Sequence, residues 1–214
     1  MINLQSISIS VQEGDIRKTE NLVVQALIEK YPPADILREG LVAGMMQTEK
    51  RKHRNEILDS EVLIVELAMK AGLQILMPVS MYTQSSFYGT VITGTLEGDN
   101  RETEKGITTV LMQSLGLRVT DLGTSVSSVR FIDTAIEEKA QLIVCATAQT
   151  IFLPQMKSLV QAAAHADIRS KTKILFSGKP VTEWFCRSIK VDMYAPDPVR
   201  AAEIAAEYCR KAVH

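Results

Sequence analysis

Apolar residues recur every three or four positions through residues 1–78, and this spacing predicts helices along that whole part of the chain. Asp15 is placed to cap a helix whose apolar face carries Leu22, Val23, Ala26 and Leu27. Tyr31-Pro32-Pro33 should end that helix, because proline cannot donate the hydrogen bond that a further turn needs.

Two more helical segments follow the prolines. One should begin near residues 33–35 and fade in the basic run from Lys50 to Arg54. Asn55 or Asp59 then opens a fourth helix, which we expect to stop before Pro78. Four helices with short connections predict a small antiparallel bundle.

Residues 79–88 are polar and lack periodicity, as is typical of a linker. We therefore place a four-helix domain in residues 1–80, a linker at 81–88 and a second domain in residues 89–214.

The second domain alternates short β-branched or apolar runs with helical ones, which predicts an α/β fold with a parallel sheet. Ligands of such sheets bind beyond the carboxyl ends of the strands, so the loops that follow the strands are the candidate site. The expected strands are 90–96, 117–121, 142–146, 173–176 and 191–194; the expected helices are 107–115, 129–139, 153–166, 181–187 and one from 198; and the candidate loops are 97–106, 122–125, 147–152 and 177–181.

The composition excludes some classes of function but does not identify one. The formal net charge is −1, so electrostatic binding of nucleic acid or of an anionic membrane is not expected. No uninterrupted apolar run is long enough to span a bilayer. Cys145, Cys186 and Cys209 are far apart and form no metal-binding spacing, so we interpret them as free thiols, with Cys145 in the core. These features predict a cytoplasmic protein.

Gly98 and Asp99, in the loop after the first predicted strand, carry a family resemblance. The loop resembles the Gly-Asp-x-His-x-x-Gly loop of corrinoid proteins from cobalamin-dependent methyltransferase systems, related to the helical-cap and B12-binding domains of cobalamin-dependent methionine synthase. In that family the His ligates cobalt and the Asp holds the His. Here Arg101 stands at the His position and Glu104 at the second Gly position. The resemblance implies a flavodoxin-like (Rossmann-type), doubly wound five-stranded sheet behind a helical bundle.

The resemblance continues through the later loops and the bundle. It implies a slot for the nucleotide tail of cobalamin, lined by small residues and hydroxyl groups, with Met45 on the bundle side. Besides Gly98, Asp99, Arg101 and Glu104, the implied cofactor-binding positions are Leu122, Gly123, Thr147, Thr150, Ser177, Gly178, Tyr194 and Met45.

Several family features are replaced in this chain. Arginine stays protonated and offers no lone pair, so Arg101 cannot ligate cobalt as a histidine would. Lys52 and Asp59 stand where the family has two apolar residues above the metal. Two plainer interpretations stay open. Gly98-Asp99 could be a simple turn pair, and the charges from Arg101 to Lys105 a solvated first helical turn.

The resemblance implies a methyl carrier that binds cobalamin and performs no complete reaction alone. Its implied partners are methyltransferase subunits and a corrinoid reductive activator. The alternative hypothesis is a divergent paralogue that does not carry cobalamin and acts as a partner or regulatory protein of a methyltransferase. The charges at Lys52, Asp59, Arg101 and Glu104 favour the alternative, whereas Asp99, Thr147, Thr150 and Gly178 favour the carrier.

Overall fold

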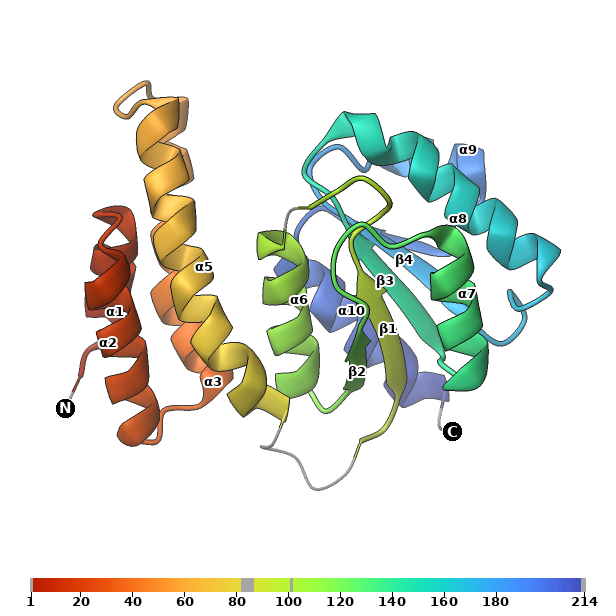
Figure 1. The fold of residues 1–214 in the computed structure, drawn as a ribbon, viewed down its shortest axis with the longest axis horizontal. Coiled ribbons are helices and arrows are strands. Elements are labelled where there is room, and N and C mark those ends of the chain that lie inside the picture. Colours follow the sequence, from red (N-terminus) through yellow and green to blue (C-terminus); the bar gives the residue numbers. More distant parts are fainter. Residues whose placement is uncertain (1, 82–86, 101, 213–214) are drawn as a thin grey trace. The chain divides into compact units, whose positions relative to one another are not determined.

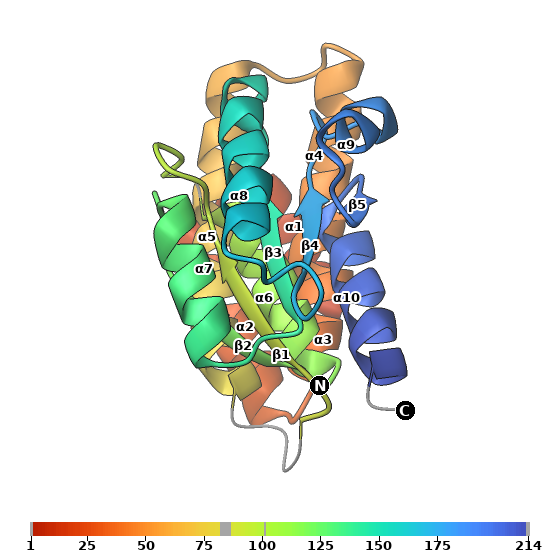
Figure 2. The same cartoon turned by 90° about the vertical axis from the view of Figure 1, so that its right-hand side faces the viewer.

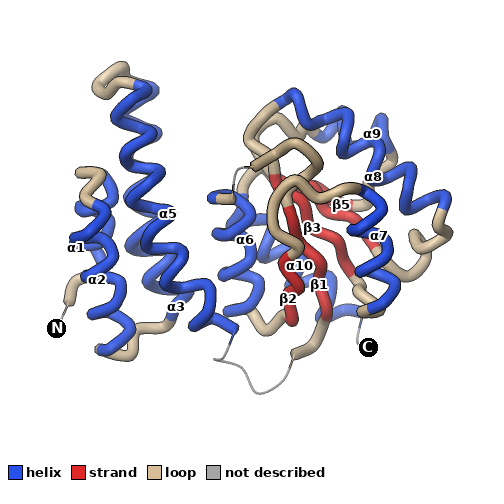
Figure 3. Tube along the Cα trace, viewed as in Figure 1, coloured by secondary structure: helices blue, strands red, loops and turns tan. Residues whose placement is uncertain are grey.

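The computed structural model describes residues 2–81, 87–100 and 102–212 of the chain. The chain forms two compact units, residues 1–83 and residues 84–214. The first is helical and the second contains the sheet (Figures 1 and 3).

The first unit is the predicted helical bundle, and its helices begin where the sequence offers caps. The Asn3 side chain accepts a hydrogen bond from the Gln5 amide, and the Asp15 side chain accepts one from Lys18 at 2.9 Å. The elements are α1 (Leu4–Gln12), α2 (Ile16–Ile28), α3 (Pro33–Asp35), the π-helix η1 (Ile36–Val42), α4 (Ala43–His53) and α5 (Asp59–Met81).

Elements α3, η1 and α4 follow one another without a break from residue 33 to residue 53, as the sequence indicates for the helix after the prolines. The sequence did not indicate that the middle of this helix is π-helical. Gly40 lies in the π segment, where an added Cβ would come within 2.9 Å of the Ile7 side chain. Glycine therefore allows α1 and η1 to approach closely.

Helix α5 corrects one prediction, because it continues to Met81 with Pro78 inside it. Pro78 and Gln74, whose carbonyl would accept the missing hydrogen bond, are both exposed, so water can solvate that carbonyl near the helix end. By length and composition, residues Ser60–Val79 could cross a membrane, with mean hydropathy 1.7. Some of the apolar side chains of α5 pack in the bundle core, where Val65, Met69 and Leu76 are buried.

The second unit contains a five-stranded parallel sheet with the strand order β2-β1-β3-β4-β5, which confirms the predicted doubly wound α/β fold (Figure 2). Its elements are β1 (Thr90–Gly94), α6 (Thr103–Ser114), β2 (Arg118–Asp121), α7 (Ser128–Glu137), β3 (Leu142–Ala146), the 3-10 helix η2 (Thr150–Phe152), α8 (Leu153–His165), β4 (Lys173–Ser177), α9 (Glu183–Ile189), β5 (Met193–Ala195) and α10 (Pro198–Ala212).

Helices cover both faces of the sheet. Helices α6 and α10 pack together on one face, and α7 and α8 cover the other (Figure 1). On the α7–α8 face, Phe131 and Met156 pack against the inward side chains of Ile92, Ile143 and Phe176. Cys145 is fully buried in the same cluster, as predicted, and burial raises the pKa of its thiol.

The strand ends differ slightly from the prediction. Strand β1 ends at Gly94 rather than Leu96, because the chain turns there and Leu96 forms only an isolated bridge with Val126. Helix α6 begins at Thr103, four residues earlier than the apolar spacing indicates. Its first turn is therefore built from the charged residues that follow the Gly98-Asp99 pair.

Candidate functional site

Asp99 lies in the loop after β1, at the edge of the sheet where the strand order reverses between β1 and β3. Only 2% of Asp99 is exposed. The Thr147 hydroxyl, directly after β3, donates a 3.0 Å hydrogen bond to Oδ2 of Asp99. The two loops on either side of the reversal are therefore joined by buried polar side chains, at the place where ligands of this fold class bind.

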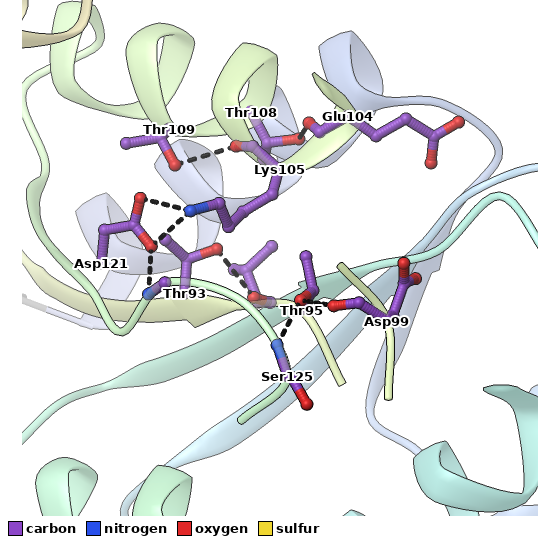
Figure 4. A network of polar contacts seen from close by, with 11 residues as sticks. Thr93, Thr95, Asp99, Glu104, Lys105, Thr108, Thr109, Asp121 and Ser125 are labelled. Carbon is purple, nitrogen blue, oxygen red and sulfur yellow. Dashed lines mark hydrogen bonds and ion pairs between the residues drawn. The ribbon is translucent and has the colours of Figure 1, made fainter. Parts of the chain in front are cut away.

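Hydrogen bonds also hold the main chain of Asp99. The Ser125 amide donates to the Asp99 carbonyl oxygen at 3.0 Å. The Thr95 hydroxyl donates to the same oxygen and accepts from the Ser125 amide at 2.9 Å (Figure 4). Gly98 precedes it with a positive φ of +86°, and the Gly98 amide donates to the Ser125 Oγ at 3.0 Å. The Gly98-Asp99 pair is therefore a turn braced to the β2–α7 loop.

Lys105 corrects the interpretation of a solvated first helical turn. Its side chain is 4% exposed, and its Nζ lies 2.7 Å and 2.8 Å from the two carboxylate oxygens of Asp121, at the end of β2 (Figure 4). The Asp121 Oδ1 also accepts from the Gly123 amide at 2.8 Å. This ion pair fixes the start of α6 to the end of β2. Because the two residues are far apart in the sequence, the sequence alone did not predict the pair.

Gly178, directly after β4, has a φ of +123° and approaches the β3 loop very closely. A Cβ added there would lie 1.8 Å from the Thr147 carbonyl oxygen and 3.2 Å from Oε2 of Glu104. The preceding residue, Ser177, is fully buried, and its Oγ has no hydrogen-bond partner among the described residues. Thr147, Ser177 and Gly178 thus come together with Glu104 from the first turn of α6.

The remaining predicted positions are more dispersed. Leu122 packs against the core on the α7–α8 face, and Thr150 is exposed at the start of η2. Tyr194 lies in the edge strand β5 and is 36% exposed. Met45 belongs to α4 in the first unit and is half-buried. Arg101 and its predicted role lie outside the described residues.

Among the described residues, no group of three or more His, Cys, Asp or Glu side chains is placed to hold a metal ion. The buried edge offers hydroxyls, amides and one aspartate, which suit an organic ligand with polar atoms better than a bare cation. The chain is thus a protein with a helical unit and a doubly wound unit, and the carboxyl edge of the sheet is its candidate small-molecule site.

Comparisons with known proteins identify the family. The model of a B12 binding domain matches residues 4–77. The dimethylamine corrinoid protein of Methanosarcina barkeri is 32% identical over 191 residues, which cover 86% of this chain and 89% of that protein. The chain therefore belongs to the corrinoid protein family.

Two solved structures support the fold. The monomethylamine corrinoid protein of Methanosarcina barkeri matches with a TM-score of 0.79 at 24% identity, covering 94% of this chain and 96% of that one. A chain of the methanol:cobalamin methyltransferase complex from the same organism matches with a TM-score of 0.55 at 22% identity, covering 99% of this chain and 84% of that one. The resemblance seen in the sequence is thereby confirmed at the level of family and fold.

Proposed function

We propose that this protein binds cobalamin at the carboxyl edge of its sheet and carries methyl groups between methyltransferase partners, with no histidine from the chain on the cobalt. Membership of the corrinoid protein family supports binding, and the likeness to a chain of the methanol:cobalamin methyltransferase complex supports partners of that kind. Access to a corrinoid reductive activator, and a cytoplasmic location, are parts of the same proposal.

The observation that carries the proposal is the buried hydrogen bond between Thr147 and Asp99 beside Gly178. A carboxylate and a hydroxyl at 2% exposure are costly to desolvate, and they mark this edge as polar in an otherwise apolar interior. Gly178 allows the backbone to approach a ligand closely, and the Ser177 hydroxyl offers a hydrogen bond that the described residues do not use. These groups suit the ring nitrogen and ribose of a nucleotide tail.

When bound, cobalt would supply the chemistry by accepting a methyl group and releasing it. The residues of the chain would bind and orient the cofactor. The Ser177 hydroxyl would donate a hydrogen bond to one of its polar atoms, Thr147 would keep its proton on Asp99, and the braced Gly98-Asp99 turn would hold the loop. Because Arg101 has no lone pair, cobalamin would bind either with its own base on the cobalt and outside the slot, or with the base in the slot and no strong lower ligand.

Glu104 favours the second candidate function, a corrinoid-protein paralogue without cofactor that serves as a partner or regulatory protein of a methyltransferase. Its carboxylate lies against Gly178, within the space that the tail would need. Such a chain would keep the scaffold and the surfaces that partners recognise, while its own side chain fills the slot.

A visible absorption spectrum separates the two candidates. The protein is incubated with hydroxocobalamin, freed of unbound cofactor and compared with bovine serum albumin treated in the same way. Retained colour near one equivalent supports the carrier, and the band positions report whether the cofactor's base stays on cobalt. A colourless protein, checked also with methylcobalamin, would overturn the carrier proposal. In the loaded protein, Arg101→His should shift the bands if residue 101 faces the metal.

A further inference from the structure

Glu104 occupies a place where a ligand of this fold would lie. It stands in the first turn of α6, directly after the β1 loop, and its Oε2 is buried. That oxygen lies 3.2 Å from the position of a Cβ on Gly178, which follows β4 on the other side of β3. The Glu104 side chain therefore extends from α6 across the carboxyl edge of β3.

The surroundings of this carboxylate are those of a polar slot. Phe176 and Ile174 face the α7–α8 core, so the alternation of β4 directs Ser177 to the α6–α10 face, the face from which Glu104 comes. Ser177 is fully buried, and its Oγ makes no hydrogen bond to the described residues. A buried hydroxyl left in this way indicates a ligand group that would complete its hydrogen bonding.

We propose that Glu104 is a built-in plug of this slot, which leaves it when the nucleotide tail of a corrinoid enters. The inference rests on the proposed function, because the tail is the group that needs the space. The side chain of a residue in a first helical turn can change rotamer toward solvent without moving the helix backbone. The amino-terminal end of α6 stabilises the carboxylate in either position.

The plug makes a discriminating prediction, because it opposes the nucleotide tail and not the corrin ring. Dicyanocobinamide is a corrinoid that lacks the tail. We therefore expect Glu104→Ala to lower the Kd for hydroxocobalamin by about tenfold or more, and the Kd for dicyanocobinamide by less than about twofold. Both values come from absorbance titrations of the full chain, with circular dichroism to verify folding.

Two further variants sharpen the test. Glu104→Gln keeps the length of the side chain and removes its charge, so it should resemble the wild type if volume closes the slot. Glu97→Ala removes an exposed acid from the same loop and should leave both Kd values unchanged.

The outcomes separate the plug from the proposed function. If wild type and Glu104→Ala bind hydroxocobalamin equally well, or if the two corrinoids gain equally from the substitution, the plug is wrong and corrinoid binding stands. If Glu104→Ala binds hydroxocobalamin and the wild type does not, Glu104 closes the slot permanently, so the displaceable plug is wrong and the carrier proposal falls in favour of the cofactor-free paralogue. If neither chain binds either corrinoid, both proposals fall.

Discussion

The hydroxyl of Thr147 donates to the carboxylate of Asp99 across 3.0 Å, although 48 positions separate the two residues in the sequence. The bond joins the loop after β3 to the loop after β1, and both residues are 2% exposed. It therefore serves the fold of the edge as well as the ligand that we propose for it.

Removing this hydroxyl should destabilise the second unit. Thr147→Val keeps the shape of the side chain and deletes a buried hydrogen bond to a carboxylate, so we expect the free energy of unfolding to fall by about 2 kcal/mol. Urea unfolding followed by circular dichroism measures the change. Thr150→Val, an exposed site in η2, is the matched control and should change the free energy by less than about 0.5 kcal/mol. Equal effects of the two substitutions would argue against the role of the bond.

Two glycines with positive φ allow the cost of backbone strain to be compared with the cost of a steric clash. Gly123 has a φ of +86°, and an added Cβ would meet no atom within 4 Å, whereas at Gly178 it would lie 1.8 Å from the Thr147 carbonyl oxygen. Gly123→Ala should therefore cost only the strain, about 1 kcal/mol. Gly178→Ala should cost about 3 kcal/mol or more, because the β3 and β4 loops must separate. Thermal unfolding of the two variants checks the order, and a Gly123→Ala variant as unstable as Gly178→Ala would contradict it.

The buried Lys105–Asp121 pair should behave differently from the exposed pairs of the chain. Lys105→Met leaves the Asp121 carboxylate, 22% exposed, without its cation, and we expect a loss of about 3 kcal/mol. Lys105→Met combined with Asp121→Asn should recover part of that loss. Arg200→Met breaks the exposed pair with Glu203 and should cost less than about 1 kcal/mol. Denaturant unfolding of the wild type and the three variants gives these free energies. A double variant that is less stable than Lys105→Met alone would contradict the ion pair between Lys105 and Asp121.

Two cysteines should make stability depend on alkaline pH. Burial raises the pKa of Cys186 and of Cys209 to about 11, above the value of about 8.5 for a free thiol. Above about pH 8.5 the unfolded chain has lost these protons while the folded chain keeps them, so stability falls as the pH rises toward 11. The double variant Cys186→Ala, Cys209→Ala should lose less stability between pH 8 and pH 10.5 in urea unfolding. Parallel curves would show that other groups cause the fall.

Much of the fold could be predicted from the sequence because its apolar periods are clear. Strand β3 (Leu142–Ala146) was predicted at its true bounds, since a fully buried parallel strand is a continuous apolar run. The end of β1 was missed because Leu96 continues the apolar run after the chain has left the sheet to form the braced turn. The π segment in residues 36–42 was missed because the apolar spacing there also suits an ordinary helix.

The sheet topology predicted where the candidate site lies, but the sequence did not predict its side-chain contacts. Parallel strands place their carboxyl ends along one edge, so the loops holding Asp99, Thr147 and Gly178 were expected to lie together. The partners of Lys105 and Glu104 were not predictable, because charged residues in a first helical turn are commonly solvated. The contact of Lys105 with Asp121 and that of Glu104 with Gly178 depend on where α6 packs on the sheet.

The bracing of Asp99 bears on how this edge can change over generations. Asp99 accepts hydrogen bonds from Thr95, Ser125 and Thr147, which all lie outside residues 100–105. Substitutions in that stretch therefore leave these three donors unchanged. A loop whose shape depends on donors outside it can acquire new ligand chemistry by substitution while its turn is kept.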